Sequence, residues 1–541
     1  MKNITKPRNR FYLSALLAIA FGLLLTLLFC KFVPYNMDEF IHYSNLSCLY
    51  YKFNFLNSFR EACGGYDLYE PLTGLKFPIR TFAYSGSFGS LYYLPLFLIW
   101  KSPFSARFLG MIFLMADSFL ISRLFKFKFR YIFIFILLFF PFSYQHLADT
   151  GPVGFQIFSV IAIYYFLTKW LEKPLIRYPL LIVLDFFLAF WLKPVFAWLV
   201  PGILVFTVAE LILHRKNLVK HQNLYFAQAA FALSLLLAIF AWLFAYYDIG
   251  ASVKIFPWLN LVENARVYGL KTLLNLKNIQ AMRLYADLIN PLEATQRAFE
   301  VFPANLLSKI YAGLFYFGLS LIFFAVLMAK KKIVLALRTL AFGTGFLLSE
   351  FFAFRTKDSW AMHHFVLGLS FLVLLYGQFI GYICEKYLRE RKIHFLYLLV
   401  AALFIGSNIF YFAIFLGQRI ESWDDWSKVD ANKILNDPDL AKNYLYVVVD
   451  WGMYYYQALY GDKNQSVLYL EPFDKKDQLT KIISLQKQYQ RKILIVYREG
   501  TGSLNSKVIS QIEGLYDCKL TPTGQVWRIK LQDSLDGNIC L

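Results

Sequence analysis

The sequence predicts a polytopic α-helical membrane protein that carries a small α/β domain at its C-terminal end. Three observations predict this fold class. Hydrophobic residues make up 58% of the 541 residues, and the mean hydropathy is +0.48. Long apolar runs alternate with short clusters of Lys and Arg, and the tail 418–541 is polar with short strand-like runs. This composition excludes an ordinary soluble globular protein.

The basic residues lie between the apolar runs rather than on one patch. The net charge of +20 therefore indicates a chain oriented in a lipid bilayer, and we expect no nucleic acid as a partner. The six cysteines are too few and too dispersed for a disulfide scaffold, and the sequence has no CxxC or Cys/His metal spacing. Cys48 with Cys63 and Cys518 with Cys540 share segments on the expected oxidising face, which leaves disulfides open there.

The first apolar run, 11–32, is long enough to cross a bilayer. The basic residues Lys2, Lys6, Arg8 and Arg10 precede it, so we predict a cytoplasmic N-terminus. The run is longer than the apolar core of a cleavable signal peptide, so we expect a retained helix.

A long outer loop, 34–104, follows this helix and contains the run Ser90–Trp100. That run is short, aromatic at its start and broken by Pro95, so it is either a span or a helix lying in the interface. If it spans, the basic cluster Lys126–Arg130 falls outside. If it is interfacial, every later basic cluster falls in the cytoplasm. We therefore predict an interfacial helix and about eleven transmembrane helices.

The predicted spans after the first alternate in direction, with the basic clusters on the cytoplasmic side. The first two of them cover 106–125 and 131–144, and the next three end at Lys169, Lys193 and His214. The following span covers 224–247, three more end at Lys330, Phe352 and Lys386, and the last covers 395–416. This path predicts a multi-pass protein whose C-terminal domain is extracytoplasmic.

We predict two domains. The transmembrane domain, 1–417, has outer loops at 34–104 and 248–308, and the extracytoplasmic domain is 418–541. The second domain contains strand-like runs and helical patterns, an order typical of a small α/β domain. These segments are 444–449, 493–497 and, between the two, the helical pattern 475–489.

Unusual polar residues gather on the outer face of this topology. They are Asp38 and Glu39 after the first span, Arg107 at the start of the second, Asp149 before the fourth, Lys193 at the end of the fifth, and His363 and His364 before the tenth. Each has an ordinary structural interpretation. Asp149 fits a helix cap, Lys193 a side chain that reaches the interface, and the others solvated loop residues or helix-end anchors.

Together these residue types suit a reaction on a phosphate-linked lipid. A carboxylate can deprotonate an acceptor hydroxyl. Lys, Arg and His can hold and neutralise a leaving phosphate. A divalent cation between the acids and the phosphate is an option. The sequence has no Gly-rich phosphate loop or Walker sequence, so we expect no nucleoside triphosphate as an energy source.

The order and spacing of these features resemble the GT-C superfamily of membrane glycosyltransferases. The resemblance is nearest to bacterial relatives of the protein O-mannosyltransferases and of the lipid A aminoarabinose transferase. The matching segments are Met37-Asp38-Glu39-Phe40, 89–97, 105–110, Pro141 followed by Asp149, Lys193, and His363-His364-Phe365. His146 stands where the family carries an arginine before the second acid, and Gly151 replaces the second acid of an Asp-x-Asp pair.

The resemblance implies transfer of a sugar from a polyprenyl-phosphate carrier, with inversion, to a glycan, lipid or protein acceptor. The reaction would serve cell-envelope glycan biosynthesis at the non-cytoplasmic face of a bacterial inner (plasma) membrane. It implies that Asp38 is the base, with Glu39 orienting it or sharing a cation, and that Asp149 is the second acid. The donor-phosphate contacts would be Arg107, Lys193 and one of His363 and His364. A divalent cation, Mg²⁺ or Mn²⁺, would be held by Asp38 and Asp149.

Two other functions stay open at this point. A flippase or transporter of lipid-linked glycans would show pseudo-symmetric halves with broken helices, which the sequence does not show. A glycan polymerase or ligase would favour a large, arginine-rich outer loop. The loop 248–308 carries only Arg266, Arg283 and Arg297, which argues mildly against it.

Overall fold

The computed structural model describes part of the chain, and the account below concerns that part. The described residues are 6–32, 35, 38–46, 68–69, 77–78, 80–82, 85–126, 133, 143, 146–147, 153–246, 332–355, 366–383, 444–448, 451–461, 467–469, 492–498, 522–523 and 526–531. The chain divides into two compact units. Unit 1 comprises 1–33, 83–85 and 106–422, and unit 2 comprises 34–82, 86–105 and 423–541.

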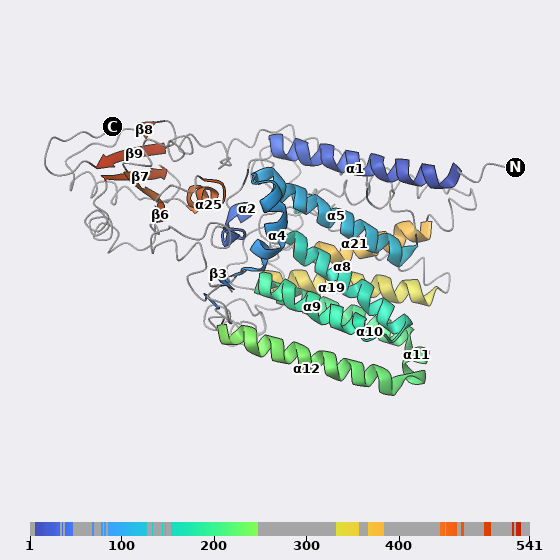
Figure 1. The fold of residues 1–541 in the computed structure, drawn as a ribbon. Helices are drawn as coiled ribbons and strands as arrows, with labels where there is room; N and C mark the ends of the chain where they lie inside the picture. Colours follow the sequence, from blue (N-terminus) through green and yellow to red (C-terminus); the bar gives the residue numbers. More distant parts are fainter. Residues whose placement is uncertain are drawn as a thin grey trace, which may run out of the picture. The chain divides into compact units, whose positions relative to one another are not determined.

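Unit 1 is a bundle of long helices (Figure 1). Its elements are α1 (Lys6–Phe32), most of α5 (Pro103–Phe125), α8 (Val153–Glu172), α9 (Arg177–Leu192), the 3-10 helix η2 (Pro194–Leu199), α10 (Val200–Leu213), α11 (Arg215–Lys220), α12 (Gln222–Tyr246), α19 (Ile333–Arg355), the 3-10 helix η4 (Val366–Gly368) and α21 (Leu369–Ile383). The predicted spans that fall in the described ranges are all helical. Three predicted spans lie largely outside those ranges, namely 131–144, the span that ends at Lys330, and 395–416.

Several of these helices have the length and composition of membrane spans. Among the described residues, four qualify: Pro103–Phe125, Val153–Glu172, Pro194–Leu213 and Gln222–Trp242. Shorter apolar helices run over Ile19–Lys31, Phe88–Ile99, Ile333–Ser349 and Leu369–Tyr382. Helix α12 exposes large apolar side chains such as Phe226 (77%) and Leu237 (61%), as expected of a lipid-facing surface. The chain is thus a membrane protein, and the total of about eleven spans stays a prediction.

Glycines allow close helix packing in the middle of unit 1. Helix α10 packs against α19, and α19 packs against α21. A Cβ at Gly202 of α10 would lie 2.5 Å from the ring of Phe371 in α21 and 2.8 Å from the carbonyl oxygen of Gly345 in α19. Only a glycine permits this approach, which is how small residues bring membrane helices together.

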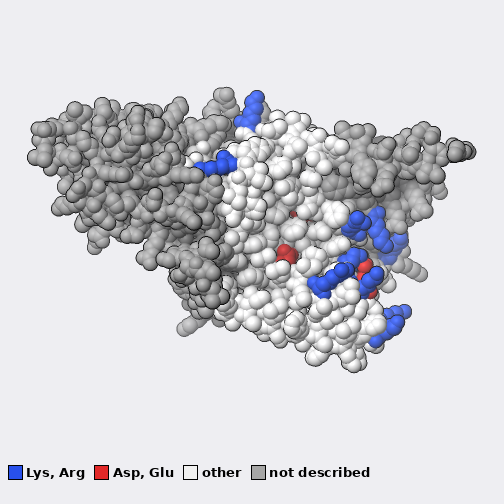
Figure 2. Space-filling model, in the orientation of Figure 1, with Lys and Arg blue, Asp and Glu red and all other residues white. Residues whose placement is uncertain are grey.

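The basic side chains of unit 1 gather at one end of the bundle. Figure 2 shows most of the Lys and Arg side chains on the visible face at the end where α11 lies in Figure 1. The described residues concerned are Arg123, Lys169, Lys173, Arg177, Arg215, Lys216, Lys220 and Lys332. We call this the basic end. Its charge is what the sequence predicts for the cytoplasmic side, and the orientation itself stays a prediction.

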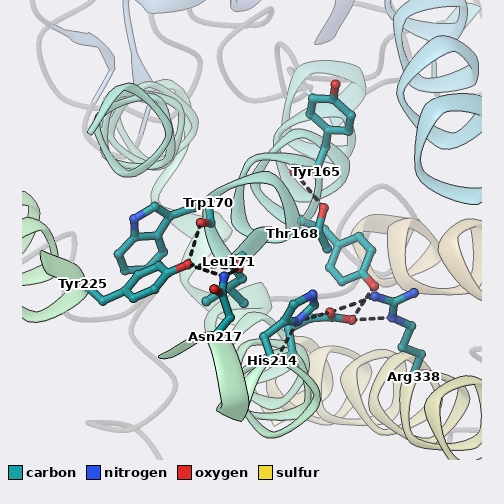
Figure 3. Close-up of polar contacts among 10 residues, drawn as sticks. Tyr165, Thr168, Trp170, Leu171, His214, Asn217, Tyr225 and Arg338 are labelled. Atoms are coloured by element: carbon teal, nitrogen blue, oxygen red, sulfur yellow. Dashed lines mark hydrogen bonds and ion pairs between the residues drawn. The ribbon is translucent and has the colours of Figure 1, made fainter. Parts of the chain in front are cut away.

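A buried polar cluster links three helices near the basic end. Figure 3 shows Arg338 of α19 and His214 pointing toward one carboxylate, which belongs to Glu210 of α10. Arg338 donates to it through Nε (2.6 Å to Oε1) and Nη2 (2.9 Å to Oε2), and the Tyr164 hydroxyl of α8 donates to Oε1 at 2.7 Å. The carboxylate is thus paired and hydrogen-bonded, as a buried charge requires.

Unit 2 combines short elements from the predicted first outer loop with the C-terminal part of the chain. The helices are α2 (Asp38–Ile41), α4 (Phe88–Ile99) and α25 (Trp451–Tyr460). The short strands β1 (Leu68–Tyr69), β2 (Phe77–Pro78), β3 (Arg80–Phe82) and β4 (Ser85–Gly86) precede α4. The predicted domain boundary at 417/418 lies outside the described residues and stays a prediction.

The C-terminal strands form one sheet in the order β6-β5-β7-β9-β8. Its strands are β5 (Tyr444–Val448), β6 (Val467–Tyr469), β7 (Lys492–Arg498), β8 (Pro522–Thr523) and β9 (Val526–Leu531). Strand β5 is parallel to both β6 and β7, whereas β9 is antiparallel to β7 and β8. Strands β5 and β7 lie where the sequence predicts them. The predicted helical pattern 475–489 is outside the described residues.

Helix α4 is too short to cross a bilayer. Its 12 residues extend about 18 Å, whereas an apolar bilayer core is about 30 Å thick. The C-terminal end of the helix exposes Leu98 (55%), Ile99 (84%) and Trp100 (47%). Its length and exposed apolar end agree with the interfacial helix that the sequence predicts.

Candidate active site

The acid pair begins a one-turn helix. Helix α2 comprises only Asp38–Ile41, and the backbone continues through turns in which Tyr43 N–H donates to the Phe40 carbonyl at 3.1 Å. Glu39 is 2% exposed, and Phe40 is 1% exposed. Glu39 is therefore buried and is not a solvated residue at the start of a loop. For Asp38 the structure describes the backbone but not the side chain.

Buried polar residues hold the turn after α2. The Asn45 amide donates to the Thr81 hydroxyl at 2.9 Å, and that hydroxyl donates to the Gly86 carbonyl at 3.2 Å. The Ser90 hydroxyl of α4 reaches the His42 carbonyl at 3.5 Å. Sequence reasoning missed these residues, because single Ser, Thr and Asn side chains in a loop give no distinctive pattern.

Arg107 lies fully buried at the start of α5. Its Nη1 donates to the carbonyl of Phe29, in the last turn of α1, at 2.8 Å. The last carbonyls of a helix lack partners within the helix and carry partial negative charge. Arg107 thus supports the C-terminal end of α1, and its cationic head lies at that end.

Lys193 lies at a break between two helices. Pro194 disfavours helical backbone at the preceding residue, and Lys193 is extended, with φ −157° and ψ 118°, between α9 and η2. Its side chain is only 3% exposed. Lys193 is therefore covered by protein and does not reach out to an interface.

Two polar side chains donate hydrogen bonds to backbone carbonyls around the helix break. The Gln156 amide of α8 donates to the carbonyls of Ala189 (3.2 Å) and Lys193 (2.7 Å). The Ser85 hydroxyl donates to the Leu192 carbonyl at 3.2 Å. Sequence reasoning missed both, although the Lys193-Pro194 step is a signal that such partners are needed.

Arg107 and Lys193 lie toward the same end of the unit 1 bundle. Helix α5 carries Arg123 in its last turn, and α9 begins at Arg177, so both run between the basic end and the opposite end. Figure 1 shows the start of α5 and the end of α9 at the end away from α11. The two cations are thus separated from the basic cluster by the length of the bundle.

The residues before Asp149 are anchored to α5. His146 and Asp117 are both fully buried, and their Nε2 and Oδ2 atoms are 3.0 Å apart. A Cβ at Gly110 would lie 1.6 Å from the His146 carbonyl oxygen, so α5 accepts this segment only with glycine there. His146 thus pairs with a carboxylate that the sequence analysis had not singled out.

The remaining predicted site residues lie outside the described residues. These are Asp149, His363 and His364. Within the part of the chain that the structure describes, no group of three or more His, Cys, Asp or Glu side chains could hold a metal ion. The metal prediction at Asp38 and Asp149 concerns side chains outside that part and stays a prediction.

No protein-family model matches the sequence, and no curated protein matches it. Solved structures of ArnT and of an archaeal oligosaccharyltransferase are similar in structure to this chain. ArnT from Cupriavidus metallidurans, bound to undecaprenyl phosphate, shares 13% identity, with 97% of this chain and 99% of that chain covered and a TM-score of 0.49.

Two structures of an archaeal oligosaccharyltransferase are also similar to this chain. The apo form of the Archaeoglobus fulgidus enzyme shares 12% identity, with 90% of this chain and 69% of that chain covered and a TM-score of 0.47. AglB from Archaeoglobus fulgidus, in complex with an inhibitory peptide and a dolichol-phosphate, shares 12% identity, with 89% and 69% covered and a TM-score of 0.43.

Proposed function

We propose that this protein is an integral membrane glycosyltransferase of the cell envelope. It moves a sugar from a polyprenyl-phosphate carrier to a glycan, lipid or protein acceptor on the non-cytoplasmic face of a bacterial inner membrane. The observation that carries the proposal is the burial of Arg107 (0% exposed) and Lys193 (3%) at the end of the bundle away from the basic end. Lys and Arg side chains form charge-assisted hydrogen bonds with phosphate oxygens, and the phosphate of a lipid-linked sugar is such an anion.

The proposed reaction is a single displacement. Asp38 takes the proton from the acceptor hydroxyl, and the hydroxyl oxygen forms a bond to the anomeric carbon of the sugar. The bond from that carbon to the phosphate oxygen breaks, and its electron pair leaves with the polyprenyl phosphate. Lys193 and Arg107 neutralise the charge that develops on this phosphate. Attack opposite to the leaving group inverts the anomeric configuration.

The other predicted residues keep their proposed roles. Glu39 orients Asp38, Asp149 acts as the second acid, and His363 or His364 contacts the donor phosphate. A divalent cation, Mg²⁺ or Mn²⁺, would be held by Asp38 and Asp149 and would screen the phosphate charge.

The proposal is tested with the purified chain in lipid vesicles. Polyprenyl-phosphate sugars are supplied with a membrane extract as acceptor, since a dolichol-phosphate and undecaprenyl phosphate are the lipids in two of the compared structures. We expect consumption of the sugar carrier and a glycosylated product. Movement of an unaltered carrier across the bilayer would instead favour a transporter, and joining of whole glycans on a pyrophosphate carrier would favour a ligase.

Lys193→Met is expected to lower the transfer rate about 10²-fold, the usual cost of one charge-stabilising donor in a transition state. Methionine keeps the length and burial of the side chain but removes the charge. The measurement is kcat with a saturating donor, beside thermal unfolding of the same preparation. Lys169→Met is the matched control, because Lys169 lies at the basic end with 30% of its side chain exposed. Loss of stability with kcat retained would make Lys193 a structural cation instead.

A further inference from the structure

Helix α25, in the C-terminal part of the chain, packs against the helix that carries the acid pair. Figure 1 draws α25 beside α2, and the two are in contact. The ring of Phe40 meets the rings of Tyr456 and Tyr460 edge to face, with centroids 5.3 Å and 5.9 Å apart. Such edge-to-face pairs are favourable beyond the area they bury. The side chain directly after Glu39 is thus held by two tyrosines of α25.

The same tyrosine also joins α25 to α4. The hydroxyls of Tyr460 and Tyr93 lie 3.1 Å apart, and the Tyr93 hydroxyl lies 2.5 Å from the Ser105 hydroxyl oxygen. Lys101 Nζ donates to the carbonyl of Gly461, the residue after α25, at 3.2 Å. The end of α25 therefore has a fixed place relative to α4.

Helix α4 in turn contacts the segment after α2. The rings of Tyr43 and Tyr93 have centroids 4.7 Å apart, and Ser90 reaches the His42 carbonyl at 3.5 Å. Tyr460 thus stands where α2, α4 and α25 meet, all within unit 2.

The electrostatics agree with this placement. Burial raises the pKa of Tyr460 well above its usual value, the neighbouring Tyr93 raises it further, and Glu39 makes the smallest contribution in the same direction. Burial also raises the pKa of Tyr93 to about 12, an effect that hydrogen bonds to Ser105 and Tyr460 partly offset. Both phenols therefore stay protonated at neutral pH.

We propose that Tyr460 is a positioning residue for the acid pair, so that the C-terminal part of the chain is required to hold Asp38 and Glu39 in place. A helix of four residues cannot maintain its own conformation, since one turn costs more to order than its hydrogen bond returns. Its position must come from tertiary contacts, and α25 supplies them through Phe40. The proposal rests on the proposed function, in which this acid pair acts on the acceptor.

The test compares Tyr460→Ala and Tyr460→Phe with the full chain in lipid. Alanine removes the ring that contacts Phe40, and a misplaced base is expected to lower kcat about 10²-fold with the KM for the donor retained. Phenylalanine keeps the ring and loses one hydrogen bond, so kcat is expected to fall less than about tenfold. Tyr178→Ala, on α9 in unit 1, is the matched control and should retain wild-type kcat.

A second measurement does not depend on activity. Amide hydrogen exchange over 38–46 is expected to be faster in Tyr460→Ala than in wild type, while exchange in α8 and α9 is unchanged. Wild-type kcat together with wild-type exchange in a folded Tyr460→Ala would overturn the proposal. If the wild type transfers no sugar, the proposed function fails, and the exchange measurement alone decides whether α25 holds α2. If Tyr460→Ala unfolds the protein, the Tyr460→Phe variant decides the question. Retained exchange protection over 38–46 with a kcat loss under tenfold supports the positioning role of the Tyr460 ring. A kcat loss as large as that expected for Tyr460→Ala contradicts it.

Discussion

Substitution of Asp38 by asparagine is expected to lower the rate of sugar transfer about 10³-fold, within the usual range for removing a general base. Asparagine keeps the size of the side chain and its acceptor oxygen, but its amide cannot take up a proton from the acceptor hydroxyl. Donor binding should persist, because the proposed phosphate contacts, Arg107 and Lys193, are unchanged. The measurement is single-turnover transfer at saturating donor, beside donor binding to the same preparation.

Glu39→Gln is the matched control for Asp38→Asn. Both substitutions remove one carboxylate from the same one-turn helix. Glu39 is 2% exposed, and its proposed role is to orient Asp38, so we expect a smaller loss of rate than for Asp38→Asn. A larger loss in Glu39→Gln would assign the base to Glu39. Equal retention of activity in both variants would contradict a carboxylate base in this helix.

The sequence predicts the helices of unit 1 well because the signals for them are local. Apolar runs of sufficient length mark the spans, and basic clusters mark their ends. The end of α9 is predicted for the same reason, since Pro194 acts on the backbone of its direct neighbour. The shortness of α4 also has a local signal, in the apolar run that stops at Trp100.

Contacts between distant segments could not be predicted. Tyr93 and Tyr460 are 367 positions apart, and Glu210 and Arg338 are 128 apart. Neither pair belongs to a periodic pattern, so the sequence gives no reason to join them. The pairing of Asp117 with His146 was missed for a related reason, since an acid inside an apolar helix shows that a partner is needed but does not identify it.

For the candidate site, the sequence indicated residue types and order rather than geometry. It placed Lys193 at a helix end, which the structure shows, but the interface interpretation of its side chain was wrong because the side chain is covered by protein. Arg107 was predicted as a phosphate contact or a helix-end anchor, and its bond to the Phe29 carbonyl joins it to the end of another helix, α1, which the sequence did not indicate. A phosphate contact by the same guanidinium stays a proposal, since one guanidinium has five N–H donors.

Arg338→Met is expected to destabilise the transmembrane bundle by about 3–5 kcal/mol, the usual cost of leaving one member of a buried ion pair without its partner. The Glu210 side chain is 1% exposed, whereas that of Arg338 is 21% exposed. Glu210→Leu should therefore cost less, because the remaining arginine can reach water more easily than the remaining carboxylate. Thermal unfolding in detergent, followed by the loss of monodisperse protein, measures both effects.

The double variant Glu210→Leu/Arg338→Met separates the cost of a lone charge from the worth of the pair. Replacing both members of a buried ion pair by apolar residues is often close to neutral, so the double variant should recover most of the stability lost in Arg338→Met. Lys169→Met is the control, because its pair with Glu172 is exposed and such pairs contribute at most about 1 kcal/mol. Losses that simply add in the double variant would show that Glu210 and Arg338 contribute independently rather than as an ion pair.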